Sequence, residues 1–197
     1  MSQRQDPSLT ASPRLIAIGA STGGPPVLRT ILAQMPPTLR APVVIVQHMA
    51  PRLDRSFVNW LGQATGFPVE AATQGTPLRP GRAYLAPAGQ QLGIGEYGVL
   101  NLEVAPAEHG ACPSVDYLFR SVAHRYGRHA IGVLLTGMGE DGAGELLTMR
   151  RAGAVTVAQD EASATVFGMP GAAIRLDAAQ YILPPQAIAD LLRRLAG

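Results

Sequence analysis

Three short, continuous apolar runs, each ending in small or polar residues, constrain the fold of this chain more than any other feature. They lie at residues 15–18 (LIAI), 43–46 (VVIV) and 131–135 (IGVLL). An apolar run of four or five residues bounded by turn residues is typical of a strand buried on both faces, and such strands belong to parallel sheets. We therefore expect the three segments to lie in one sheet.

Segments with helical periodicity alternate with these runs. After the first run, apolar residues recur every three or four positions, at Val27, Leu28, Ile31, Leu32 and Met35. Similar patterns predict helices near residues 54–64, 113–126 and 143–152 and from Pro185 onward, with further strands at 155–158 and 181–183. This alternation predicts an α/β fold, a doubly wound and mostly parallel sheet with helices on both faces.

The middle of the chain follows a different pattern. Residues 82–86 and 92–104 resemble shorter strands, and Gly93, Gly95 and Gly98 interrupt the second of them. Glycines between short apolar stretches favour a reversal of the chain. We expect an antiparallel hairpin near residues 82–104.

Length and composition predict one globular domain. The chain has 197 residues, of which 47% are hydrophobic and 15% charged, a composition that suits a packed core and not a disordered protein. Residues 1–13 are polar and contain two prolines, so we expect a disordered lead-in there and one domain over residues 14–197.

Charge and cysteine content exclude several classes of function. The net charge is +2 and no basic stripe with interleaved aromatic residues is present, so no nucleic-acid partner is expected. The single cysteine, Cys112, excludes an internal disulfide and a Cys/His zinc motif. No run approaches the roughly 18 apolar residues of a membrane helix. We expect a cytoplasmic protein without membrane insertion, metal or cofactor, and the sequence leaves its oligomeric state open.

Three strand ends carry side chains suited to catalysis. Ser21 follows the first apolar run, His48 the second and Asp141 the third. In open parallel sheets, ligands bind outside the carboxyl ends of the strands, where the loops enter helices. The predicted architecture therefore brings these three residues to one edge.

The three residue types suit nucleophilic catalysis. A serine hydroxyl is a weak nucleophile unless an imidazole removes its proton, and a carboxylate fixes the tautomer of that imidazole. Gly23 and Gly24 allow a sharp turn and close approach of a substrate to the backbone. N–H groups at the following helix start could stabilise developing negative charge.

Each feature also has a simpler interpretation. A glycine-rich turn after a first strand often binds phosphate, although this loop has no Walker lysine and no GxGxxG spacing. His48 could be a structural histidine, and Asp141 could cap the helix that follows it. The order serine, histidine, aspartate also differs from that of α/β-hydrolases, which points to another fold.

Several motifs resemble the catalytic domain of the chemotaxis protein-glutamate methylesterases, the CheB family, from about residue 14 to the end of the chain. These motifs are LIAIGASTGG at residues 15–24, QHM at 47–49, YLAP at 84–87, PSVD at 113–116, LTGMGEDGA at 135–143, AQDEAS at 158–163 and FGMP at 167–170. Their number and order make the resemblance specific.

The resemblance implies hydrolysis of glutamate methyl esters on the cytoplasmic signalling helices of methylated chemoreceptors, and deamidation of certain receptor glutamines. It assigns Ser21 as nucleophile, His48 as general base and acid, and Asp141 as the partner that orients the histidine. Thr22 and Met138 match residues that line the same site and are expected to assist oxyanion binding.

Two departures from the family pattern keep other functions open. Members commonly carry an N-terminal receiver domain, where this sequence has only residues 1–13, so phosphorylation control is not predicted. Residues 108–112 (EHGAC) are less basic than expected for docking to receptors, with Arg52, Arg55 and Arg120 as possible contributors. The alternatives are a serine esterase of the same fold with another substrate and a catalytically silent binding module. Cys112 is expected to be inert.

Overall fold

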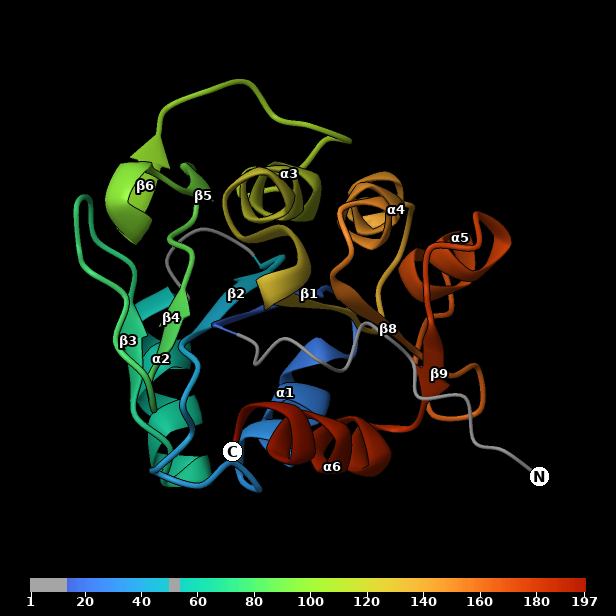
Figure 1. The fold of residues 1–197 in the computed structure, drawn as a ribbon, viewed down its shortest axis with the longest axis horizontal. Coiled ribbons are helices and arrows are strands. Elements are labelled where there is room, and N and C mark those ends of the chain that lie inside the picture. The colour runs from blue at the N-terminus through green and yellow to red at the C-terminus, as the bar shows by residue number, and fades with distance from the viewer. Residues whose placement is uncertain (1–13, 50–53) are drawn as a thin grey trace.

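The computed structural model describes residues 14–49 and 54–197, and the lead-in predicted at residues 1–13 lies outside them. The described residues form a seven-stranded sheet in which every pairing is parallel (Figure 1). In spatial order the strands are β3 (Val69–Ala71), β4 (Ala83–Leu85), β2 (Val43–Gln47), β1 (Leu15–Ala20), β7 (Ala130–Leu134), β8 (Val155–Gln159) and β9 (Tyr181–Leu183). The predicted doubly wound α/β fold is confirmed.

Helices cover both faces of the sheet (Figure 1). One face carries α1 (Gly24–Leu32), α2 (Asp54–Thr65) and α6 (Pro185–Ala196), and the other carries α3 (Val115–Tyr126), α4 (Ala143–Arg151) and α5 (Met169–Arg175). A short 3₁₀ turn, η3 (Gly127–His129), leads from α3 into β7. None of the helices in the described part of the chain is both long enough and apolar enough to cross a membrane.

The central strand β1 shows why the sequence forms two cores. All six of its residues are buried. Because successive side chains of a strand point to opposite faces, Ile16 and Ile18 join the cluster under α1 and α6, whereas Leu15 and Ala17 join the one under α3 and α4. The continuous apolar run is therefore needed on both faces.

The antiparallel hairpin is smaller than expected. It consists of β5 (Gln91–Ile94) and β6 (Leu100–Glu103), joined by a 3₁₀ turn, η2 (Glu96–Gly98). Residues 83–85 do not belong to it, because β4 joins the main sheet parallel to β2. The pattern also gave no expectation for β3, which is short, lies at the edge of the sheet and is only partly buried.

The order of the strands explains where the site forms. From β1 the chain continues to β2 on one side, while β7 lies on the other side of β1 and is followed by β8 and β9. The loops after β1, β2 and β7 consequently meet at one edge of the sheet, at the point where the winding reverses. This is where open α/β sheets bind their ligands.

Candidate active site

The turn after β1 holds Ser21 in a fixed position. Its N–H donates to the carbonyl of Thr136, at 3.0 Å, and its own carbonyl accepts from Gly24 N–H at 2.8 Å. Gly23 adopts φ +80°, and a Cβ there would lie 2.4 Å from Thr165 Oγ1. Both the conformation and the lack of space therefore require glycine at this position.

Substituting Gly23 by alanine should cost more stability than the conformational strain alone. Gly89 is a matched control, because its φ is also +80° and a Cβ there would meet nothing within 4 Å. We expect Gly89→Ala to cost about 1 kcal/mol and Gly23→Ala about 2–4 kcal/mol, with a loss of activity only in the second. Urea unfolding of both variants measures the difference. Equal losses of stability would contradict the steric argument.

The pairing of β1 with β2 places His48 beside this turn. It follows β2 directly, and its N–H donates to the carbonyl of Ala20 at 2.9 Å, continuing the ladder between β1 and β2. Its side chain is 19% exposed, and its Nε2 lies 2.8 Å from Asp141 Oδ2. His48 and Ser21 line one cavity of about 450 Å³.

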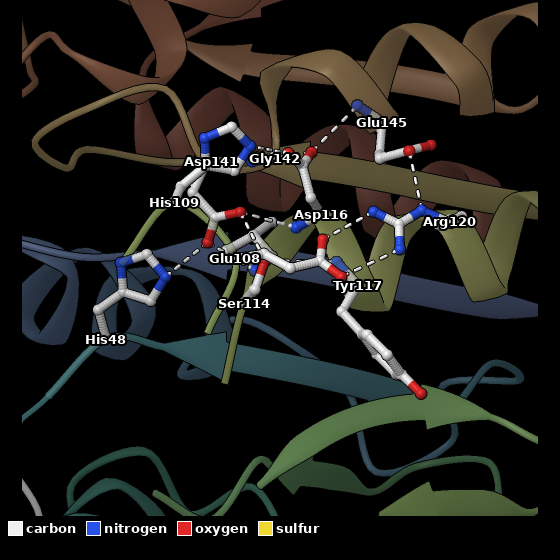
Figure 2. Close-up of polar contacts among 11 residues, drawn as sticks. His48, Glu108, His109, Ser114, Asp116, Tyr117, Arg120, Asp141, Gly142 and Glu145 are labelled. Carbon is white, nitrogen blue, oxygen red and sulfur yellow. Dashed lines mark hydrogen bonds and ion pairs between the residues drawn. The ribbon is translucent and has the colours of Figure 1, made fainter. Parts of the chain in front are cut away.

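Asp141 is held by hydrogen bonds from two elements (Figure 2). Its Oδ2 contacts His48 Nε2 at 2.8 Å and accepts from Val115 N–H at 2.7 Å. Its Oδ1 accepts from Ser114 Oγ at 2.8 Å and from Asp116 N–H at 2.9 Å. Burial by itself would raise the pKa of Asp141, but these hydrogen bonds outweigh it and lower the pKa. The 3%-exposed side chain is therefore held as a carboxylate.

The alternative interpretation, in which Asp141 caps the helix that follows it, is wrong: the N-cap of α4 is Gly142, and Asp141 caps α3. Its carboxylate accepts from the first N–H groups of α3, although it precedes α4 in the sequence. In return, Asp116 in the first turn of α3 accepts from Gly142 and Glu145 N–H at the start of α4, both at 3.1 Å. The two helices thus exchange caps, which fixes the orientation of Asp141 toward His48.

The hydrogen bond to Asp141 decides which nitrogen of His48 can act as a base. A carboxylate at Nε2 favours the tautomer with its proton on that nitrogen. Nδ1 is then unprotonated and can accept a proton. The Ser21 hydroxyl makes no hydrogen bond to any described residue, so it is available to Nδ1 or to a substrate.

Two N–H groups near Ser21 could stabilise an oxyanion. Among the described residues, the N–H groups of Thr22 and Met138 have no acceptor. A Cβ on Gly137 would lie 2.6 Å from the Cβ of Ser21, so the chain leading into Met138 packs directly against the serine. The Met138 side chain itself is 77% exposed. The predicted roles of Thr22 and Met138 therefore fit their main-chain atoms better than their side chains.

His48 lines two cavities. The one shared with Ser21 is also lined by Thr22 and Gly23 and has an aromatic wall, in which the rings of Phe57 and Trp60 stack at 5.5 Å. The second, of about 320 Å³, is lined by residues including His109, Cys112, Met138 and Asp141. Burial raises the pKa of the Cys112 thiol, which supports its expected inertness.

The structure adds residues that the sequence did not assign to the site. Ser114 and Asp116 lie at the start of the helix predicted near residues 113–126, and the PSVD motif is the sequence signal for them. Gln47 had no assigned role, although it precedes His48 directly.

The arginines named as possible docking residues lie in different settings. Arg120 does not serve as a free docking residue, because it pairs with Glu108 at 2.7 Å and Glu145 at 3.0 Å (Figure 2). Arg52 lies outside the described residues, and Arg55 is exposed.

One group of side chains has ligand types that suit a metal. Atoms of His109, Asp116 and Asp141 lie within 4.8 Å of one another. However, His109 Nε2 already contacts Asp116 at 2.8 Å, and both oxygens of Asp141 accept two hydrogen bonds each. A cation would have to displace the cap of α3, so these residues do not fit a metal.

The sequence of this chain matches a known protein family. The family description "CheB methylesterase" matches residues 16–192, which include Ser21, His48 and Asp141. The chain belongs to the CheB methylesterase family. The resemblance drawn from the motifs is thus confirmed across nearly the whole described structure.

Relatives within the family are close in sequence and structure. A protein of Syntrophus aciditrophicus named protein-glutamate methylesterase/protein-glutamine glutaminase 1 is 50% identical over 183 residues, covering 93% of this chain and 52% of the relative. A relative of the same name, number 2, from Methanospirillum hungatei is 47% identical with the same coverage. This chain therefore spans about half the length of these curated relatives.

The fold agrees with that of a solved structure. The crystal structure of the Thermotoga maritima CheB methylesterase catalytic domain superposes with a TM-score of 0.90 at 34% sequence identity. The superposition covers 94% of this chain and 100% of the Thermotoga domain. The fold of this chain therefore matches that of the Thermotoga domain over the whole length of that domain.

Proposed function

We propose that residues 14–197 form a catalytic domain that hydrolyses glutamate methyl esters through Ser21, His48 and Asp141. The observation that carries this proposal is the contact of 2.8 Å between His48 Nε2 and the buried Asp141 carboxylate, with His48 lining the same cavity as Ser21. Histidine held in this way is a base for a hydroxyl nucleophile. The relatives named protein-glutamate methylesterase support the choice of substrate.

The reaction proceeds in two steps, acylation of Ser21 and hydrolysis of the acyl-enzyme. His48 Nδ1 takes the Ser21 proton as Oγ attacks the ester carbonyl, and the N–H groups of Thr22 and Met138 stabilise the resulting oxyanion. The intermediate then collapses with cleavage of its bond to the methoxide, which takes the proton from the imidazolium and leaves as methanol. The acyl group remains on Ser21 as the acyl-enzyme. Water, deprotonated by His48, attacks the acyl group, and its proton returns to Ser21 as the glutamate carboxylate is released.

The same machinery accommodates a glutamine side chain. The leaving group is then the amide nitrogen, which accepts the proton from His48 and departs as ammonia, just as the methoxide departs as methanol in the first reaction. We propose methylated chemoreceptor signalling helices in the cytoplasm as the substrate. The names of the relatives, which include protein-glutamine glutaminase, support both reactions.

Methanol release from a methylated receptor fragment tests this function against its alternatives. We expect methanol in proportion to glutamate carboxylate formed, together with saturable kinetics. Hydrolysis of a small activated ester without any release of methanol from the receptor would favour an esterase with another substrate. No hydrolysis of either compound, and no labelling of Ser21 by a fluorophosphonate, would favour a binding module.

A further inference from the structure

Gln47 belongs to the QHM motif at residues 47–49, but neither the proposed chemistry nor the resemblance assigns it a role. It is the last residue of β2, where it pairs with Ala20, the last residue of β1. The side chain is 3% exposed. A buried amide at this position needs hydrogen-bond partners, and the identity of those partners shows what it holds in place.

The amide nitrogen of Gln47 bridges the two proposed reacting residues. Nε2 donates to the main-chain carbonyl of Ser21 at 2.9 Å and to that of His48 at 2.8 Å. An amide nitrogen has two hydrogens, so both are used. The opposite orientation would place the amide oxygen against two carbonyl oxygens, which fixes the direction of the group.

The oxygen at the other end of the amide, Gln47 Oε1, is buried and has no hydrogen-bond partner among the described residues. An unpaired buried acceptor costs free energy, and such exceptions often mark functional positions. The two hydrogen bonds made by the amide nitrogen are what offset this cost.

Gly24 provides the space for this arrangement. A Cβ on Gly24 would lie 2.1 Å from Gln47 Oε1 and 2.9 Å from Ala20 Cβ. Of the two consecutive glycines after Ser21, Gly23 is required by its positive φ, whereas Gly24 leaves room for the amide. The glycine pair and the glutamine before His48 therefore form one structural unit, although they are far apart in the sequence.

From this geometry we propose that Gln47 is a positioning residue that sets the distance between Ser21 and His48. The regular ladder between β1 and β2 ends where His48 N–H donates to Ala20, and beyond that point the amide ties the two loops together. The proposal rests on the proposed function of Ser21 and His48. Gln47 touches no reacting atom, so it acts only through the position of the other two residues.

Replacing Gln47 by glutamate and by methionine tests the proposal. Glutamate keeps the shape but places oxygen against both carbonyls, and methionine removes both hydrogen bonds at similar volume. We expect kcat for methanol release to fall about 100-fold in Gln47→Glu and less in Gln47→Met, with little change in KM. The maximal rate of Ser21 labelling by a fluorophosphonate should fall in parallel with kcat. Gln34→Glu is the control, because Gln34 also donates to a main-chain carbonyl, that of Thr30, but outside the site.

Rates are expressed per folded molecule, with the folded fraction measured by circular dichroism. If both variants keep kcat within about threefold of the wild type, the proposal is wrong. It is equally wrong if the loss disappears after correction for the folded fraction, because the role of Gln47 is then only structural. Activity retained by Ser21→Ala would instead overturn the proposed function itself.

Discussion

Ser21→Ala is expected to lower kcat for methanol release by about 10⁴- to 10⁶-fold. The variant lacks the only atom that can form the acyl-enzyme, whereas the hydrogen bonds of the turn involve main-chain atoms and remain. Stability should therefore change little. Methanol measured over time from a methylated receptor fragment gives the rate, and thermal unfolding checks the fold.

Comparison of the Ser21 and His48 variants tests whether the two residues act as one catalytic unit or contribute independently. His48→Ala should lose a similar amount of activity, and the double variant should lose hardly more than either single one, because a nucleophile without its base is already inactive. Ser121→Ala is the matched control, since this hydroxyl bonds to the hairpin at Ile94 N–H and not to the site. Activity that survives in Ser21→Ala, or single losses that multiply, would contradict the proposed mechanism.

Asp141→Asn should lower kcat by about 10⁴-fold. The amide keeps the shape of the carboxylate, but it cannot stabilise the imidazolium of His48 and it favours the wrong tautomer. It also replaces one acceptor oxygen by a donor, although both oxygens of Asp141 accept from two donors in the wild type. Steady-state kinetics with a methyl ester measure the loss.

The same variant should change how stability depends on pH. The pKa of Asp141 is lowered in the folded protein, so its contribution is present above the unfolded value of about 3.9 and is lost as pH falls through the folded value. Asp116 has the opposite effect on the pH dependence of stability. Burial raises its pKa, so ionisation of this carboxyl destabilises the folded protein as pH rises. The charge of Asp141 also helps to raise the pKa of Asp116, so comparison of Asp141→Asn with the wild type measures the contribution of Asp141 together with its coupling to Asp116.

Urea unfolding between pH 3 and 7 measures this effect. Near neutral pH the free energy of unfolding of the wild type should exceed that of Asp141→Asn by about 1–3 kcal/mol. This difference should shrink as the solution is acidified. Asp190→Asn is the control, because Asp190 is exposed on α6 and its one ion pair within residues 14–49 and 54–197 is with Arg193. A difference that stays constant across this range would contradict the ionised state assigned to Asp141.

The central strands and the glycine turn could be predicted from the sequence because they depend on local chemistry. A strand buried on both faces must be apolar throughout, as in β1, and a turn at φ +80° next to Thr165 must contain glycine. The edge strand β3 escaped prediction, since half-buried residues at an edge carry no such pattern. The strand at residues 83–85 was predicted, but its parallel pairing with β2 was not, because pairing partners depend on the whole sheet.

The α/β class, the family and the residue types at the strand ends follow from the order of the amino acids alone. The groups that hold those residues in place depend on how the chain packs. Asp141 caps α3 and not the helix that follows it, and Gln47 bridges Ser21 and His48 across two strands. The physical reason is that buried polar groups take whichever partners the packed chain brings within hydrogen-bond distance, whatever their separation in sequence.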